Sequence, residues 1–297
     1  MNPRIQIVAA YALMCSIWGT TWLGIKIGLR TMPPVTGVGI RFVIGGLFLY
    51  ALAAIWQRPP HISKLPWKLI LILSATLFGL NYVLTYTAET GLSSGLVAVL
   101  FGTLPFFMFA FGHFMLAERT TVMTWVGAAL AFAGVAVISI GGSAQGSVWY
   151  IVAAVAAAVI SAFANVYAKR HSDVDPLIVL PPSMLIAGIV LAIVGFAFEH
   201  PHGDAFGTSS LLAILYLAIF GSGIAFFLNL WLLQRIDAGI VGLSALIIPV
   251  IAVFVGILFG GEAFGIRDLL GAALVVVGVG FALTRPRHTA PICPIEG

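Results

Sequence analysis

The sequence predicts an all-α integral membrane protein with ten transmembrane helices, arranged as two inverted five-helix repeats. Three observations predict this fold class. Hydrophobic residues make up 61 % of the 297 residues and charged residues only 8 %, whereas soluble proteins carry about 25 % charged residues. Apolar runs long enough to cross a bilayer follow one another along the whole chain, and the second half repeats residue types of the first at a nearly constant spacing. The composition excludes a disordered chain, a disulfide scaffold and a cytosolic enzyme.

Ten segments are long enough to span a membrane, because a helix needs about 20 apolar residues to cross a hydrocarbon core of about 30 Å. The run 120–168 is too long for one helix, and the Gly- and Ser-rich stretch 141–147 divides it into two. The predicted spans are 5–25, 33–56, 69–88, 90–117, 120–140, 148–168, 176–198, 209–234, 238–261 and 269–284. The first exceeds the usual apolar length of a signal peptide, so we interpret it as a helix.

An internal repeat relates residues 1–143 to residues 144–297. At a spacing of 144 residues the matching pairs are Gly95 and Gly239, Pro105 and Pro249, Gly112 and Gly256, Glu118 and Glu262, Gly127 and Gly271, and Gly134 and Gly278. Nearer the start of each half the spacing is 145, and the pairs are Ser16 and Ser161, Trp18 and Phe163, Thr20 and Asn165, and Trp22 and Tyr167. A gap of one residue accounts for the change in spacing.

Each repeat has five spans, an odd number, so the second repeat enters the membrane from the opposite side. Many secondary transporters are built from such inverted repeats, with the substrate near the bilayer midplane between two halves that rock to alternate access. The architecture therefore predicts a transporter. Ten of the 14 basic residues fall on the N-terminal side of the membrane and four on the other, which predicts cytoplasmic N- and C-termini. We expect the protein in a bacterial inner membrane.

Several short motifs lie in these spans. They are Ile17-Trp18-Gly19-Thr20-Thr21-Trp22 in the first, Arg41-Phe42 in the second, Gly95, Pro105 and Leu116-Ala117-Glu118-Arg119 in and after the fourth, and Gly239, Pro249 and Glu262 in and after the ninth. With the length and the number of spans, they make the chain resemble the drug/metabolite transporter superfamily, in particular its ten-helix EamA-like members. The resemblance covers nearly the whole chain, as two copies. It implies export or exchange of small metabolites, with amino-acid exporters nearest, through a central cavity formed by spans one, three, four, six, eight and nine.

Aromatic, amide and hydroxyl side chains on these spans are the candidates for substrate binding. An unpaired amide or hydroxyl is unfavourable in lipid, so such groups face a neighbouring helix or a wet cavity. Aromatic walls with a few amides suit a solute with an apolar part and a polar head, such as an aromatic or neutral amino acid. The alternative is that these groups only join neighbouring helices. The candidates are Trp18, Thr20, Phe78, Asn81, Tyr82, Phe101, Phe163, Asn165, Phe226 and Asn229.

Four residues are candidate hinges: Gly95, Pro105, Gly239 and Pro249. Both prolines lie near the middle of predicted spans, where proline removes a backbone hydrogen bond and kinks the helix. Kinked or broken helices at matching places in two repeats point to a transport site. The alternative is that these kinks serve only the packing of the bundle.

Few ionisable residues lie inside the spans, and they bear on coupling to ions. Glu89 and His113 are the candidates for a proton relay, although a lone histidine is more often a packing residue. Arg41 either meets a substrate carboxylate or, as we favour, extends to the outer interface. Glu118 and Glu262 are expected to fix loops. Because relays are scarce, we favour uncoupled or weakly coupled alternating access. The alternative is a proton-coupled antiporter, acting through Glu89, for a drug or metabolite of another solute class.

Other functions fit the sequence less well. A membrane enzyme would need a motif such as His-Glu-x-x-His within a span, and a channel would need charge rings or a carbonyl filter. We therefore expect no enzyme activity, no cofactor and no metal site. The expected partners are a small-molecule substrate and the lipid bilayer, and not nucleic acid, because the basic residues form no patch. A duplicated chain is expected to function as a monomer.

Overall fold

The computed structural model describes residues 2–56, 65–92, 97, 100–139, 148–260 and 266–283, and within these ranges it contains helices and no strands. Six helical segments are long and apolar enough to cross a membrane: Pro3–Ile25, Pro34–Ile55, Trp67–Gly91, Val148–Arg170, Pro176–Glu199 and Thr208–Leu233. Four shorter apolar helices occupy the other predicted spans: Leu104–Leu116, Val122–Val137, Ala238–Ile251 and Leu269–Leu283. An all-helical membrane protein is thus confirmed. The number of ten crossings and the inversion of the second half stay predictions.

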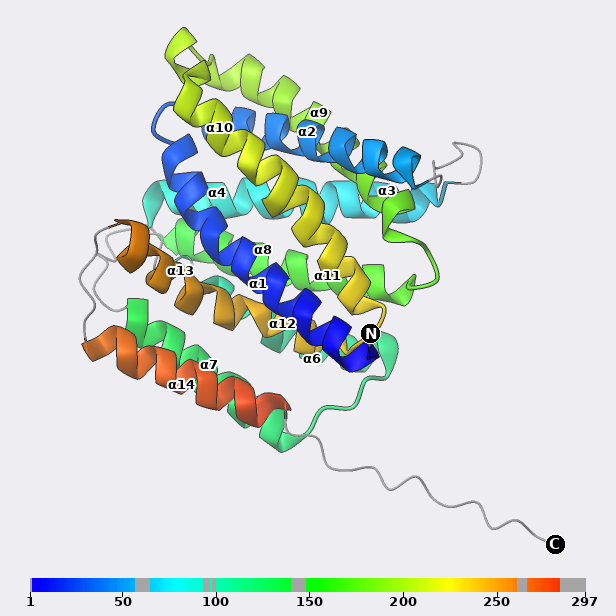
Figure 1. Cartoon of the computed structure of the whole chain (residues 1–297), viewed down its shortest axis with the longest axis vertical. Coiled ribbons are helices and arrows are strands. Elements are labelled where there is room, and N and C mark those ends of the chain that lie inside the picture. Colours follow the sequence, from blue (N-terminus) through cyan, green and yellow to red (C-terminus); the bar gives the residue numbers. More distant parts are fainter. Residues whose placement is uncertain are drawn as a thin grey trace, which may run out of the picture.

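The helices form one bundle with a pair of helices along each of two opposite edges. In chain order they are α1 (Pro3–Gly28), α2 (Pro34–Ile55), α3 (Trp67–Leu73), η2 (Ser74–Leu80), α4 (Asn81–Gly91), α6 (Leu104–Leu116), α7 (Val122–Ser139), α8 (Val148–Arg170), α9 (Pro176–Glu199), η3 (Gly203–Phe206), α10 (Thr208–Tyr216), η4 (Leu217–Ile224), α11 (Ala225–Leu233), α12 (Ala238–Gly242), α13 (Ser244–Gly260) and α14 (Ile266–Leu283). Figure 1 shows α2 beside α9 at one edge and α7 beside α14 at the other, with α1, α4, α8, α11 and α13 between them.

Glycines hold the α7–α14 pair in close contact. A Cβ atom on Gly127 would lie 2.5 Å from the carbonyl oxygen of Gly278, and one on Gly134 would lie 2.6 Å from that of Gly271. These are four of the glycines that repeat along the sequence. The hydrophobic effect does not drive helices together in lipid, and small residues stabilise their contact by letting the backbones approach. The repeated glycines therefore join an element of the first half to its counterpart in the second.

The α2–α9 pair also joins a helix of the first half to a helix of the second half. A Cβ atom on Gly188 would lie 2.9 Å from the carbonyl oxygen of Gly39. At one end of the pair, the Glu199 carboxylate accepts hydrogen bonds from the backbone nitrogens of Val35 and Thr36, at 2.9 and 2.7 Å. The first N–H groups of a helix have no partner within the helix. The Glu199 carboxylate provides acceptors for two of these N–H groups at the start of α2.

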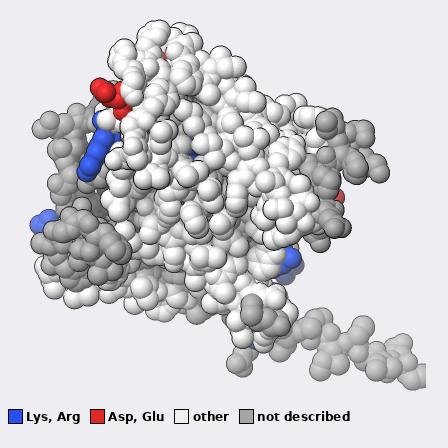
Figure 2. All heavy atoms as spheres, turned by 45° about the horizontal axis from the view of Figure 1, so that its top comes forward, with Lys and Arg blue, Asp and Glu red and all other residues white. Residues whose placement is uncertain are grey.

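The outer surface of the bundle is apolar. Phe114, Val122 and Phe198 are 82 %, 80 % and 79 % exposed, and few charged side chains are visible on the face in Figure 2. Soluble monomers rarely expose large contiguous apolar patches. Lipid tails solvate such a surface, so the polar side chains of the spans face the interior of the bundle.

Two of the long helical segments contain a π-helical stretch. In one, η2 joins α3 to α4, and in the other η4 joins α10 to α11. The two stretches occupy matching places in the predicted repeats. π-helical turns are rare and are frequent at functional sites. Since a π turn is wider than an α turn, it changes which side chains of the following helix face the centre of the bundle.

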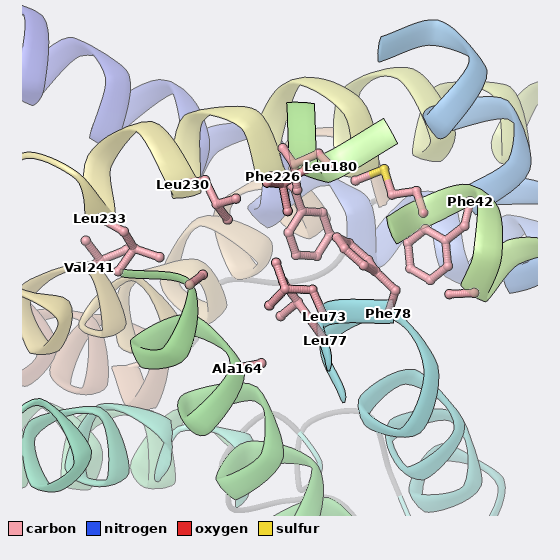
Figure 3. Close-up of a cluster of buried hydrophobic side chains, with 14 of the residues drawn as sticks. Phe42, Leu73, Leu77, Phe78, Ala164, Leu180, Phe226, Leu230, Leu233 and Val241 are labelled. Carbon is pink, nitrogen blue, oxygen red and sulfur yellow. The ribbon is translucent and has the colours of Figure 1, made fainter. Parts of the chain in front are cut away.

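A layer of aromatic rings joins three central segments to the edge helix α2, and three of its rings, Phe42, Phe78 and Phe226, are labelled in Figure 3. Phe78 on η2 packs edge-on against Phe42 on α2 and Phe226 on α11, with ring centroids 5.2 and 4.9 Å apart. Trp18 on α1 also packs against Phe226, at 5.5 Å. Edge-to-face pairs contribute about 0.5–1.5 kcal/mol each beyond the burial of their area. The layer therefore fixes α1, α2, η2 and α11 relative to one another.

Replacement of Gly278 by leucine is expected to lower the thermal stability of the protein in detergent. A Cβ atom there would lie 2.4 Å from the backbone nitrogen of Ala131, so α7 and α14 must separate, at a cost of about 1–3 kcal/mol. Gly280→Leu is the matched control on the same helix, because a Cβ atom there meets nothing within 4 Å. Equal unfolding temperatures for the two variants would show that the α7–α14 contact does not stabilise the fold.

Candidate functional site

A cavity of about 160 Å³ lies at the centre of the bundle and is lined by both halves of the chain. Its walls are mostly apolar, with amides, hydroxyls and two charged side chains among them. A cavity of roughly 150 Å³ is large enough for benzene. The lining residues are Trp18, Thr21, Ile25, Arg41, Leu77, Asn81, Tyr82, Thr85, Tyr86, Glu89, Val97, Phe101, Leu104, Met108, Ser161, Asn165, Phe226, Asn229, Val241, Gly242, Ser244, Ala245, Ile248 and Pro249.

Seven of the ten candidate binding residues line this central cavity: Trp18, Asn81, Tyr82, Phe101, Asn165, Phe226 and Asn229. They come from α1, α4, α8 and α11, and from Phe101 just before α6. The structure thus brings together residues more than 200 positions apart in the sequence. Their contact with a substrate stays a prediction.

Thr20, Phe78 and Phe163 do not line the cavity. The Thr20 hydroxyl lies 2.5 Å from the Tyr216 hydroxyl, and Phe163 packs against rings of α6 and α8. Phe78 is fully buried in the aromatic layer behind the cavity wall. The four-residue spacing of Phe78 and Tyr82 predicts one shared face, but the π-helical stretch between them changes the phase of the helix.

Two asparagines form a polar link across the cavity wall. Asn229 Nδ2 on α11 donates to Asn165 Oδ1 on α8 at 2.6 Å, and Asn165 Nδ2 donates to the Ser161 carbonyl oxygen at 2.8 Å. Asn81 is also buried, and its Oδ1 has no hydrogen-bond partner in the part of the chain that the structure describes. An amide oxygen with no described partner therefore lies buried beside the cavity.

Arg41 corrects the interpretation that we favoured from the sequence, because its side chain does not extend to the outer interface. It is 2 % exposed and lines the cavity from α2. Its Nε donates to Ser222 Oγ at 2.7 Å, and its Cζ lies 5.3 Å from the centroid of the Tyr82 ring. A hydroxyl and a ring provide partners that lipid cannot provide, and intramembrane arginines accordingly face the bundle interior.

Thr21, Thr85, Tyr86, Ser161 and Ser244 also line the cavity but are not among the candidates. A sequence signal existed for three of them. Thr85 lies on the same face of α4 as Tyr82, and Ser161 matches Ser16 in the repeat. Thr21 lies in the motif Ile17–Trp22 of the first span, whereas for Tyr86 and Ser244 the sequence contains no comparable signal.

The fourth predicted span is broken beside the cavity. A turn at Gly102 and Thr103 precedes α6, which begins at Leu104. Pro105 therefore lies in the first turn of a helix, where proline is tolerated without a kink. Pro105 starts a helix instead of bending one at mid-length, which corrects the predicted kink.

The ninth predicted span is broken as well. There, α12 ends at Gly242 and α13 begins at Ser244, and both residues line the cavity. Pro249 lies inside α13 and also lines it. Gly239 packs so closely against a ring of α6 that a Cβ atom would lie 1.8 Å from it. Gly95 lies outside the described residues. Broken helices mark transport sites in other carriers, and the hinge role of these residues stays a prediction.

The two candidate coupling residues lie in different surroundings. Glu89 on α4 lines the cavity and makes no hydrogen bond or ion pair with any residue that the structure describes. His113 is exposed near the end of α6, where its Nδ1 lies 3.2 Å from the Glu118 carbonyl oxygen. Only Glu89 is placed to meet the contents of the cavity.

A polar cluster joins the two halves at the end of the bundle beside the N-terminus (Figure 1). The Glu118 carboxylate accepts hydrogen bonds from the Ala238 backbone nitrogen at 3.0 and 3.1 Å and lies 2.7 Å from Lys169 Nζ. Lys169 Nζ also donates to the Ile236 carbonyl oxygen. This Glu118 cluster ties α6 and α8 to the start of α12. Glu262, the predicted counterpart, lies outside the described residues.

Comparison with known proteins agrees with this architecture. The model of the EamA-like transporter family matches the chain twice, over residues 6–140 and 148–284. The "Uncharacterized inner membrane transporter YedA" of Escherichia coli is 30 % identical, over 94 % of this chain and 90 % of that protein. "Protein PagO" of Salmonella typhimurium is 28 % identical, over 93 % and 92 %. The "Uncharacterized transporter YoaV" of Bacillus subtilis is 26 % identical, over 93 % and 96 %.

A solved crystal structure of another protein has the same fold. It superposes on this chain with a TM-score of 0.82 at 23 % sequence identity, and the match covers 94 % of this chain and 96 % of that one. The similarity extends to nearly the whole length of both chains, so the arrangement of helices around the central cavity is not particular to this sequence.

Replacement of Asn165 by alanine is expected to destabilise the protein by about 1 kcal/mol, because Asn229 Nδ2 loses its acceptor. Removing both asparagines is expected to destabilise the protein by less than the sum of the two single changes, since the first change already breaks the bond. The unfolding free energies of the three variants in mixed micelles check this. Strict additivity would show that the two amides do not interact.

Proposed function

The chain belongs to the EamA-like transporter family, and from this premise we propose that it exports or exchanges small metabolites, aromatic and neutral amino acids first among them, by alternating access. Relatives over nearly the whole chain are named inner membrane transporters, and six of its helices are long and apolar enough to cross a membrane. The chain is therefore a multi-pass inner membrane transporter. The proposal adds the substrate class and the mechanism.

The central cavity is the observation that supports this substrate class. Rings of Trp18, Tyr82 and Phe226 offer a surface for an apolar side chain, and the amides of Asn81 and Asn165 lie in the same wall. Pockets with apolar walls and a few placed polar groups select the orientation of a small ligand. A solute with an apolar part and a polar head matches both kinds of surface.

The contacts between the halves support alternating access. The Glu118 cluster joins α6, α8 and α12 at the end of the bundle where cytoplasmic ends are predicted. We propose that this contact is closed when the cavity faces outward and opens when the two inverted halves rock inward, with both termini in the cytoplasm. Because the two halves of one chain line the whole cavity, a monomer suffices for this cycle.

Uptake into proteoliposomes tests the proposal. We expect saturable uptake of labelled leucine, phenylalanine or tryptophan without an ion gradient, and faster uptake when the same unlabelled amino acid is inside, because a carrier exchanges solute across the membrane. Phe226→Ala is expected to reduce uptake about two- to tenfold, by the about 0.5–1.5 kcal/mol of a lost ring contact. Gly280→Leu, on the outer face of α14, is the control variant.

Two results would contradict the proposal. Uptake that neither saturates nor accelerates with internal solute would indicate a channel. No uptake of any amino acid by folded protein would exclude this substrate class and leave the transporter assignment to other metabolites.

Proton-coupled exchange is the second candidate function, because Glu89 is an acidic residue in the cavity wall without an ion-pair partner in the described part of the chain. The measured quantity is the ratio of uptake with and without a pH gradient. For uncoupled transport we expect a ratio near one both for the native protein and for Glu89→Gln. A ratio well above one that falls to one in Glu89→Gln would establish proton coupling through this carboxylate.

A further inference from the structure

The cavity wall contains a buried cation that has no counter-ion among the described residues. Arg41 is 2 % exposed, its Nε donates to Ser222, and its Nη1 has no hydrogen-bond partner within the described ranges. No carboxylate of those ranges lies within ion-pair distance of the guanidinium. An arginine side chain stays protonated in proteins. One of its N–H groups is therefore left without a partner in the described part of the chain beside the cavity.

Two aromatic rings lie against the guanidinium. The Cζ atom lies 5.3 Å from the ring centroid of Tyr82 and 5.7 Å from that of Phe42. Cation–π contacts stabilise the cation electrostatically and need no hydrogen bond. Together with the bond to Ser222, they fix the group in one orientation and leave Nη1 able to donate. Planar guanidinium edges match carboxylates, often through two parallel hydrogen bonds.

Glu89, the other charged residue of the lining, lies at a different depth. Tyr82 touches Arg41, and Glu89 follows Tyr82 by seven residues on α4, which is about 10 Å along the helix axis. The two charges are therefore separated along the cavity wall, with Glu89 nearer the end of α4.

We infer that Arg41 binds the carboxylate of the transported solute, with Nη1 donating to a carboxylate oxygen and the apolar remainder packed against Trp18 and Phe226. The inference rests on the proposed function, because it takes the cavity as the transport site, and it names the group that the site recognises. The substrate class is small organic carboxylates with an apolar group, amino acids included. Chloride or phosphate would also pair with the guanidinium, but would leave the aromatic walls without a contact.

Ligand-induced thermal stabilisation of the purified protein tests the inference. The probes are leucine, phenylalanine and tryptophan, each with its amide, which lacks the carboxylate, and its deaminated acid: isocaproate, phenylpropanoate and indolepropanoate. We expect the amino acid and the deaminated acid of at least one set to raise the unfolding temperature, and its amide to need a roughly tenfold higher concentration or more for the same shift. Sodium chloride and sodium phosphate are the inorganic arms, expected to give no shift.

Arg41→Gln is expected to remove the preference for acid over amide, and Arg41→Lys to retain part of it, because lysine keeps the charge but not the planar fork. If Arg41→Gln does not fold, the ligand series on the native protein decides alone. If the acid and its amide are transported equally well and stabilise the protein equally, the inference is overturned and the proposed function stands. Stabilisation by the inorganic anions alone would overturn the inference as well. If none of the nine organic probes is transported or stabilises the protein, both the inference and the proposed function are overturned.

Discussion

The bilayer core offers no hydrogen-bond partner to a polar group, so every amide, hydroxyl and charge of a membrane-spanning helix must find its partner within the protein or in a wet cavity. This constraint decides where the polar side chains of the chain lie. Asn165 pairs with Asn229, and Arg41 pairs with Ser222, in each case across two helices that are far apart in the sequence. Arg41, Asn165 and Asn229 line the central cavity. The outer surface consists mainly of apolar side chains, which need no hydrogen-bond partner.

Side-chain size separates the rigid parts of the bundle from its hollow part. At the edges, glycines let α2 approach α9 and α7 approach α14 until the backbones touch. At the centre, large rings such as Trp18 and Phe226 keep the helices farther apart and leave space between them. Close packing lowers compressibility, so the edge pairs are suited to move as units around a centre that holds the solute.

The sequence predicted the helical segments well, since hydropathy over about 20 residues depends only on local composition. The repeated glycines lie at helix–helix contacts, but the repeat does not predict how they pair. Gly127 contacts Gly278 and not Gly271, its counterpart in the repeat. Side-chain direction was harder to predict. Phe78 does not lie on the predicted face because it is part of a π-helical stretch, and the sequence contains no signal for such a stretch. Arg41 points into the bundle, where its partner Ser222 lies 181 residues away in the sequence. Rules that use only neighbouring residues cannot predict a hydrogen-bond partner so far away in the sequence.

The contacts that cross between the halves also determine when the protein can complete its fold during synthesis. α2 is made long before α9 and before Ser222, so its arginine first enters the membrane without the hydroxyl and without the helix that later covers it. An arginine within an inserting helix costs up to about 2.5–3.5 kcal/mol, which the apolar residues of Pro34–Ile55 offset. A chain that stops at residue 143 therefore lacks both Ser222 and the helix α9 that packs on α2.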